Sequence, residues 1–303
     1  MPKLSLLNNR LSRAVWKRVV VVLLICAPFS GFSQYWQAGG FIGTSNYSGD
    51  LVQTRVDLKY TRFALGVFLK RDINRYLTIR GGLSYGRIAG ADSTNRDTML
   101  LKRNLSFRSP IWEGQLGFEF NFLDLDEKKI TPYVFASVAL FSFYPTTKDS
   151  LGNTVNLRPL GTEGQGLAAY PTRKEYNLRQ ISIPFGAGVK ILLTENWIAG
   201  FEFGLRKTFT DYLDDVSLTY VDRNTLVRTR GQKAADFAYR GDEVTVGSHV
   251  TPGTYPTDGT IRGSDKYKDW YMFTGLTLSY RFGGGSNAHN NWRRQKVSQC
   301  PRF

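Results

Sequence analysis

The residues most able to do chemistry lie together near position 214. Asp211, Asp214 and Asp215 form an acidic cluster beside Tyr212 and Tyr220, in the stretch TFTDYLDDVSLTYVD at 208–222. Asp214 and Asp215 are the chain's one candidate for acid–base catalysis. Aspartate is also typical of turns in solvated loops. We therefore expect a solvated loop here and no enzymatic activity.

No other residues suggest a reactive centre. No histidine, cysteine and carboxylate cluster has the spacing of a metal site, and we expect the lone His249 and His289 to be loop residues. Glycines such as Gly114 and Gly117 suit close packing in strands better than a phosphate cradle. The sequence therefore predicts no metal and no cofactor.

A second polar set alternates with aromatic residues. In ENWIAGFEFGLRKTF at 195–209, Trp197, Phe201 and Phe203 fall on one parity, and Glu202 and Arg206 fall on the other. Side chains of a strand point alternately to its two faces. One face of this strand is thus apolar, while the other is ionic or small.

Eight segments show this period-two pattern or a β-branched and aromatic content typical of strands. They lie at 35–45, 60–70, 76–87, 107–121, 131–143, 178–192, 196–210 and 269–282. The connections at 71–75, 122–130 and 193–195 are short, whereas those at 46–59, 88–106, 144–177 and 211–268 are longer. This alternation of short and long connections is typical of an up-and-down membrane barrel, with short periplasmic turns and long surface loops.

The two faces indicate where each set of side chains lies. Buried charges must be paired or hydrated, and a membrane barrel places its apolar face against lipid and its polar face in the lumen. We therefore predict an all-β, eight-stranded antiparallel transmembrane barrel over residues 34–283. Its narrow lumen is filled by side chains, and we expect ion pairs between neighbouring strands. The predicted lumen residues are Arg80, Glu113, Glu119, Lys190, Glu202, Arg206 and Arg281.

A water-soluble barrel of the lipocalin kind is the alternative fold. It would have the same number of strands but would bury its apolar face and expose its charges. The alternation of apolar and polar residues alone does not distinguish the water-soluble barrel from the membrane barrel. The aromatic fringes, the unequal loops and the final LSYRF favour the membrane form.

The first 33 residues read as an export signal. They hold five bases, no acid and the apolar run VVVVLLICAP at 19–28, with small residues before Gln34. We expect cleavage between Ser33 and Gln34 and export to the outer membrane. A lipoprotein signal at Cys26 is disfavoured because Ile25 precedes it, and cleavage would leave Cys300 without a disulfide partner.

The chain is strongly basic, with a formal charge of +15. Removing five of its 40 bases with the signal leaves 35 against 25 acids, a charge of +10. For an exported barrel we expect basic loops near lipid headgroups or lipopolysaccharide, and no nucleic-acid partner. Residues 284–303 are expected to form a basic, flexible tail.

Several of these features together resemble a known family. The FSQ signal exit, the eight strands, TDYLDDVSLTYVD and the closing YMFTGLTLSYRF are similar to the PorG-like outer-membrane barrels of the type IX secretion system of Bacteroidota. The resemblance covers roughly residues 35–283, and its most specific part is Thr210–Ser217, which includes Asp211, Tyr212, Asp214 and Asp215.

This resemblance implies a non-enzymatic role in protein secretion. Such barrels are thought to associate, from the periplasmic side, with a ring made of a lipoprotein and its partner. The longer loop at 223–268 and the basic tail at 286–303 depart from a minimal family member. The alternative function is that of a generic small barrel acting as a membrane stabiliser, adhesin or narrow pore.

Overall fold

The computed structural model describes residues 35–52, 58–95, 97–244 and 253–283. The predicted export signal and basic tail lie outside the described residues. The described chain belongs to one compact unit spanning 34–284. Within the described ranges, no helix has both the length and the hydropathy needed to cross a membrane.

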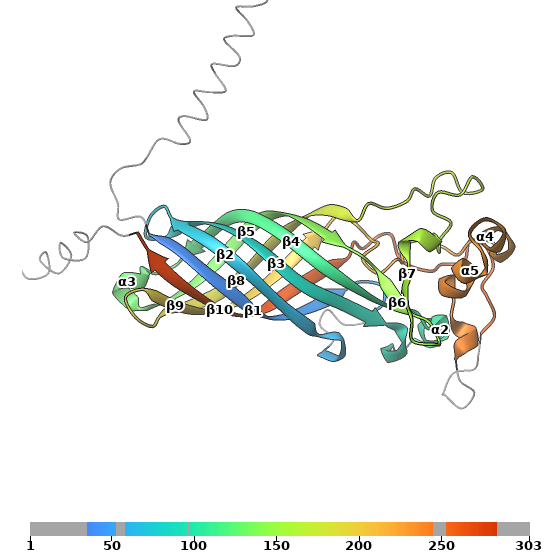
Figure 1. Cartoon of the computed structure of the whole chain (residues 1–303), viewed down its shortest axis with the longest axis horizontal. Helices are drawn as coiled ribbons and strands as arrows, with labels where there is room; N and C mark the ends of the chain where they lie inside the picture. The colour runs from blue at the N-terminus through green and yellow to red at the C-terminus, as the bar shows by residue number, and fades with distance from the viewer. Residues whose placement is uncertain (1–34, 53–57, 96, 245–252, 284–303) are drawn as a thin grey trace, which may run out of the picture. The chain divides into compact units, whose positions relative to one another are not determined.

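Eight long strands close into an antiparallel barrel, as the sequence predicts (Figure 1). Closure comes from pairing of the first and last strands, with Trp36 opposite Phe282 and Ser48 opposite Trp270. Every strand thus has two hydrogen-bonded neighbours, which removes the open edges that hydrocarbon would leave unsatisfied. The barrel strands are β1 (Trp36–Ser48), β2 (Arg62–Asp72), β3 (Leu77–Ala91), β4 (Ser106–Asn121), β5 (Ile130–Phe143), β8 (Arg179–Leu192), β9 (Trp197–Thr208) and β10 (Trp270–Phe282).

The connections differ at the two ends of the barrel. Short turns join β2 to β3, β4 to β5 and β8 to β9 at what we call the turn end, where the helical turn α3 (Leu125–Lys128) lies. The four long connections gather at the other end, the loop end (Figure 1). They contain the elements β6 (Thr146–Lys148), β7 (Thr154–Asn156), α2 (Thr98–Arg103), α4 (Arg223–Arg230), α5 (Gln232–Ala238) and the short 3-10 helices Leu58–Tyr60, Asp92–Thr94, Arg158–Leu160 and Gly241–Glu243.

The long connections are more structured than the sequence indicates. A short helix is expected within 230–240, and α5 confirms it, but the helix α4 before it is not anticipated. The hairpin β6–β7, which extends the edge of β4 through Arg108 and Thr146, is also missed. The helix α4 and the β6–β7 hairpin are too short to show a clear hydrophobic periodicity. Their formation therefore depends on how they pack within the connections.

The outer surface of the barrel is an apolar band. On β4, Trp112 and Leu116 are 62% and 66% exposed, while Glu113 between them is 2% exposed. From Trp112 to Phe120 the band covers ~27 Å of strand, or ~21 Å along the axis at a tilt near 40°. This height approaches the ≈25 Å apolar band of outer-membrane barrels. The band is therefore suited to lipid.

A charge placed in this band tests the lipid assignment. We expect Leu116→Arg to lower the free energy of unfolding in lipid vesicles by about 2–4 kcal/mol, because the guanidinium would enter hydrocarbon. Leu116→Phe is the matched control and should be nearly neutral. Both are measured by urea titration. If Leu116→Arg left the free energy of unfolding unchanged, this face would be in contact with water and not with lipid.

Candidate functional site

The charged side chains inside the barrel form the first candidate site. All seven predicted lumen residues are buried there, together with Lys70. We call these eight the ionic lumen: Lys70, Arg80, Glu113, Glu119, Lys190, Glu202, Arg206 and Arg281. The narrow diameter of an eight-stranded barrel lets long side chains meet across it.

Glu202 on β9 is bound by β3 and β5. Its two carboxylate oxygens accept from the two terminal nitrogens of Arg80 at 2.9 and 3.0 Å. The Tyr133 hydroxyl donates to the same carboxylate at 2.8 Å. The Arg80 guanidinium also lies 4.1 Å from the centre of the Phe135 ring. This bidentate geometry is the strongest form of a carboxylate–arginine pair.

Glu119 on β4 is shared by three cations. The Lys70 ammonium lies 2.8 Å from one of its oxygens, and Arg80 lies 3.6 Å from the same oxygen. Lys190 donates to the other oxygen and also donates to Asn121 at 3.0 Å. Glu119 therefore links β2, β3 and β8.

Glu113 and Arg206 form the pair closest to the loop end. Arg206 donates to the Glu113 carboxylate at 3.2 and 3.3 Å, and the Tyr271 hydroxyl donates to it at 2.7 Å. The guanidinium lies 4.4 Å from the centre of the Phe273 ring. Phe273, which breaks the alternation of the last strand, thus faces inward and packs against this pair.

The expectation of ion pairs between neighbouring strands holds for Arg80 on β3 and Glu119 on β4, which lie 3.6 Å apart, but it is wrong for the closer pairs of the lumen. Glu202 on β9 pairs with Arg80 on β3, and neither strand is hydrogen-bonded to the other. Glu113 on β4 pairs with Arg206 on β9 in the same way. The reason is geometric, since inward side chains converge on the axis and reach a partner across the barrel. Arg281 pairs instead with Asp126 in α3, at the turn end.

These pairs close the lumen. A cavity lined by Arg80, Glu202, Arg206 and Phe273, among others, has a volume of about 20 Å³. That is room for about one water molecule. The ionic lumen therefore holds the strands together and leaves no wide path through the barrel.

The second candidate site is the buried centre of the long connections. We call connections 49–61, 92–105, 144–178 and 209–269 the loop cap. The interpretation of 208–222 as a solvated loop is wrong, because Asp211, Asp214 and Asp215 are all buried. Tyr212 is partly buried and stacks on Tyr176, with ring centres 4.7 Å apart.

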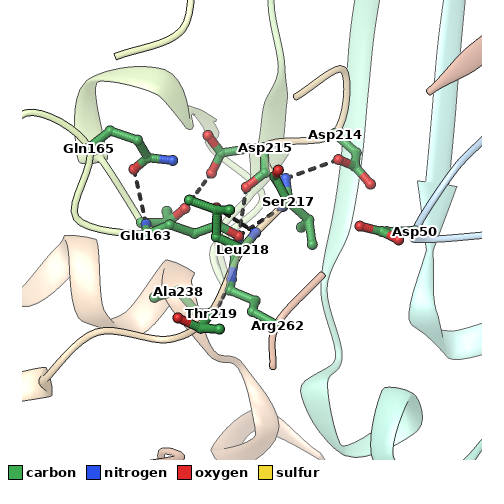
Figure 2. Close-up of polar contacts among 12 residues, drawn as sticks. Asp50, Glu163, Gln165, Asp214, Asp215, Ser217, Leu218, Thr219, Ala238 and Arg262 are labelled. Carbon is green, nitrogen blue, oxygen red and sulfur yellow. Dashed lines mark hydrogen bonds and ion pairs between the residues drawn. The ribbon is translucent and has the colours of Figure 1, made fainter. Parts of the chain in front are cut away.

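Asp215 and Glu163 are bound by groups from two connections, 144–178 and 209–269; Figure 2 shows how Glu163, Asp215, Ser217 and Arg262 lie together. Asp215 accepts from the hydroxyls of Thr162 and Tyr176, both at 2.6 Å. Arg262 donates to the Glu163 carboxylate at 2.9 Å and to the Asp215 carbonyl at 2.7 Å. Glu163 also accepts from the backbone amide of Ser217 at 2.9 Å. The motif residues are thus the centre of the cap.

Arg103 connects this centre to the first two connections. It donates to the Asp92 carboxylate at 2.6 and 2.7 Å, to the Asp50 carbonyl at 3.2 Å and to the Arg262 carbonyl. There is no sequence signal for Glu163, Arg103 and Arg262, because they lie in connections that show no regular alternation of apolar and polar residues. Lys70 does carry one, because it alternates with the outward Phe63, Leu65, Val67 and Leu69.

The buried centre of the cap has more acids than bases. Among the described cap residues, the buried set comprises six carboxylates and three guanidiniums: Asp92, Glu163, Asp211, Asp214, Asp215 and Asp269 against Arg103, Arg240 and Arg262. The same described residues contain no group of three or more His, Cys, Asp or Glu placed to hold a metal ion. Hydroxyls and backbone amides donate to several of these carboxylates.

Asp214 and Asp269 share one hydroxyl. The Tyr47 oxygen lies 2.7 Å from one and 2.9 Å from the other. A phenol has one proton, so the second contact is a hydrogen bond only if that carboxyl is protonated. Burial, followed by a neighbouring carboxylate, raises the pKa of both Asp214 and Asp269 well above the ordinary value.

Burial also raises the pKa of the other two motif aspartates. The pKa of Asp211 rises to about 7, with Asp50 and Glu163 adding repulsion. The pKa of Asp215 rises to about 6, although Arg262 and two hydroxyls oppose the rise. The backbone of Asp215 is in the left-handed region at φ 69°, which aspartate tolerates better than most residues.

The model of a domain of unknown function, DUF6089, matches residues 16–154, which is less than half of the chain. A search of curated protein sequences finds no match.

Among solved structures, the chain is similar to Ail, the attachment invasion locus protein of Yersinia pestis. They are 8% identical, with 83% of this chain and 100% of that chain covered and a TM-score of 0.39. Neisserial surface protein A is 10% identical, with 83% and 98% covered and a TM-score of 0.38. A major outer membrane protein of Thermus thermophilus is 13% identical, with 83% and 100% covered and a TM-score of 0.39. Likenesses this distant carry no functional argument.

Breaking a lumen pair tests its structural role. We expect Glu202→Leu to lower the free energy of unfolding by about 3–5 kcal/mol, because Arg80 would lose its buried partner. Insertion should persist, since the apolar band and the strand pairing are unchanged. The readout is the temperature at which the folded gel band converts to the unfolded one. Glu202→Leu combined with Arg80→Leu should recover part of the loss, and an unchanged conversion temperature for the single variant would contradict the prediction.

The raised pKa values make the loop cap sensitive to pH. The folded cap binds more protons than the unfolded chain between about pH 4 and the folded pKa of about 7 for Asp211. Its stability is therefore fully present below this window and falls as pH rises through it, by up to ~1.4 kcal/mol per pH unit for each such group. Hydrogen exchange of the Leu213 and Val216 amides, corrected for intrinsic rates, should show less protection at pH 8 than at pH 5.5.

Asp211→Asn should weaken this dependence and protect the cap at pH 8. Its amide oxygen can accept from Ser217, as the Asp211 carboxylate does at 2.8 Å. The exposed Asp265→Asn is the matched control and should leave the dependence unchanged. If hydrogen-exchange protection of the Leu213 and Val216 amides increased with pH, ionisation of the cap carboxylates would not destabilise the cap, and the prediction would be wrong.

Proposed function

We propose that the protein is a non-enzymatic outer-membrane component of a type IX protein secretion machine, where it anchors or organises periplasmic ring partners. The observation that carries the proposal is the position of the stretch Thr210–Ser217, on which the resemblance to PorG-like barrels is most specific. Its acidic side chains are buried at the centre of the loop cap. Leu213 and Val216 of this stretch also lie in one buried apolar cluster with residues of the other three long connections, so the stretch is part of the whole architecture.

The chemistry of the candidate sites supports a role without catalysis. Asp214 and Asp215 are bound by tyrosine and threonine hydroxyls of the same chain, which leaves them no access to a substrate. In the ionic lumen, carboxylates are held by cations in a space of about one water. Both arrangements are suited to stability, because these carboxylates are bound by other groups of the protein.

The turn end is the surface that we assign to periplasmic partners. Short turns of outer-membrane barrels face the periplasm, and long loops face outward. The exposed charged residues Glu127, Lys128 and Lys129 lie in and beside α3. Because β10 finishes at the same end, we propose the predicted tail at 291–303 as a second part of this surface. We propose membrane lipid and lipopolysaccharide as the other partners and propose no nucleic-acid partner.

The alternative is a generic small barrel acting as a membrane stabiliser, adhesin or narrow pore. The closed lumen disfavours the pore. The loop cap would instead serve an adhesin, because the long loops of outer-membrane barrels face outward. This alternative needs no periplasmic partner, and that difference separates the two functions.

Co-purification in mild detergent tests the proposal. We expect the wild-type protein to be recovered with a periplasmic lipoprotein and its partner. The turn-end variant Glu127→Lys with Lys128→Glu keeps the net charge and should lose at least half of the bound partner. The loop-end variant Arg228→Gln with Lys233→Gln is the control and should retain it. Recovery of the wild type as an isolated monomer would support the generic barrel.

A further inference from the structure

The outward face of β3 and β4 carries a compact basic and aromatic cluster near the loop end. Its members are Tyr85 and Arg87 on β3, and Arg108 and Trp112 on β4. We call these four residues the rim cluster. They lie on the same parity as the apolar band, with Leu83 and Leu116 below them, so they point away from the ionic lumen.

The strand register places the four side chains together. Tyr85 lies directly opposite Trp112, and their ring centres are 4.7 Å apart. Arg87 lies opposite Pro110, and Arg108 lies opposite Ala89, so the two arginines are diagonal neighbours. The Arg87 Nε donates to the Tyr85 hydroxyl at 2.8 Å, and its guanidinium lies 6.0 Å from the centre of the Tyr85 ring.

The cluster has the depth of a lipid headgroup. Trp and Tyr of membrane barrels mark the boundary between hydrocarbon and headgroups. Arg87 is two residues beyond Tyr85, which is ~7 Å along the strand and ~5 Å along the barrel axis at a tilt near 40°. The two guanidiniums therefore lie just above the aromatic belt, at the level where lipid phosphates begin.

The charge of the cluster is not neutralised by the protein. Both arginines are exposed, and in the part of the chain that the structure describes neither forms an ion pair with a carboxylate. Arginine binds phosphate through paired N–H donors, and two guanidiniums can bind the oxygens of one phosphate group. The aromatic pair beneath would contact the first carbons of the acyl chains.

We propose that the rim cluster binds the phosphate of a glycolipid headgroup of the lipid A class in the outer leaflet. The inference rests on the proposed outer-membrane location and goes beyond the secretion role. A lipid is the occupant because the cluster continues the apolar band without a break, so its ligand must combine a phosphate with acyl chains. A glycolipid of this class would contact both the arginines, through its phosphate, and the aromatic pair Tyr85 and Trp112, through its acyl chains. A free phosphate would contact the arginines alone.

The rim offers a matched control on its other side. Arg179 on β8 and Lys207 on β9 are also outward and exposed near the loop end. The outward residues nearest to them on their own strands are the aliphatic Ile181 and Leu205. The variants Arg87→Gln with Arg108→Gln, and Arg179→Gln with Lys207→Gln, each remove two positive charges. They differ in whether the two charges are neighbours. Lys207 lies opposite Ile183, four residues from Arg179 along β8, so the two control charges are too far apart to bind one phosphate, although Phe185 and Trp270 lie beside Lys207.

The test is titration of the purified full-length barrel in detergent micelles with diphosphoryl lipid A, followed by native mass spectrometry. We expect one tightly bound lipid A and at least ~10-fold weaker binding for Arg87→Gln with Arg108→Gln. The control variant should stay within ~3-fold of the wild type. Heat-dependent gel mobility confirms that each variant is folded.

Two further arms identify what is bound. Dephosphorylated lipid A should bind the wild type as weakly as diphosphoryl lipid A binds the rim variant, and excess inorganic phosphate should displace little lipid. Equal loss in both double variants, or unchanged binding in the rim variant, would overturn the proposal. Full displacement by inorganic phosphate would also overturn it, because the site would then be an anion site. None of these outcomes bears on ring co-purification, so the secretion role is tested separately.

Discussion

A carboxylate inside a narrow barrel is stable only if cations and hydroxyls surround it, and this constraint organises the protein. Glu113, Glu119 and Glu202 each meet it with partners from other strands of the closed sheet. Each pair therefore acts as a strut across the lumen, and the struts occupy the space that a channel would need. An ionic interior and a closed lumen are two results of the same pairing.

The loop cap meets the same constraint in a different way. Its buried acids exceed its buried bases, so hydroxyls, backbone amides and bound protons complete the neutralisation. Tyr47 reaches from β1 to Asp214 and Asp269, which ties the cap to the barrel wall. The cap is therefore sensitive to pH, because its crowded carboxylates exchange protons near neutrality.

The outer surface divides the molecule into three zones with different partners. The apolar band faces lipid, the cap extends beyond it at one end, and the small turns with α3 remain at the other. Arginines at the rim lie between lipid and cap, where headgroups are expected. A secretion role needs only the turn end to be recognised, which leaves the rim and the cap available for the outer leaflet.

Alternation in the sequence was enough to predict the eight barrel strands, their outward and inward faces and the inward position of seven charged residues, because a period of two maps directly onto the two faces of a strand. Lys70 follows the same rule. Which charges pair was decided only by the tertiary structure, since closure brings β9 opposite β3 and β4. The burial of Asp211, Asp214 and Asp215 was decided there too. Loop sequences show no regular alternation of apolar and polar residues, so they do not indicate which side chains are buried. These acids are removed from water only because the four connections pack together.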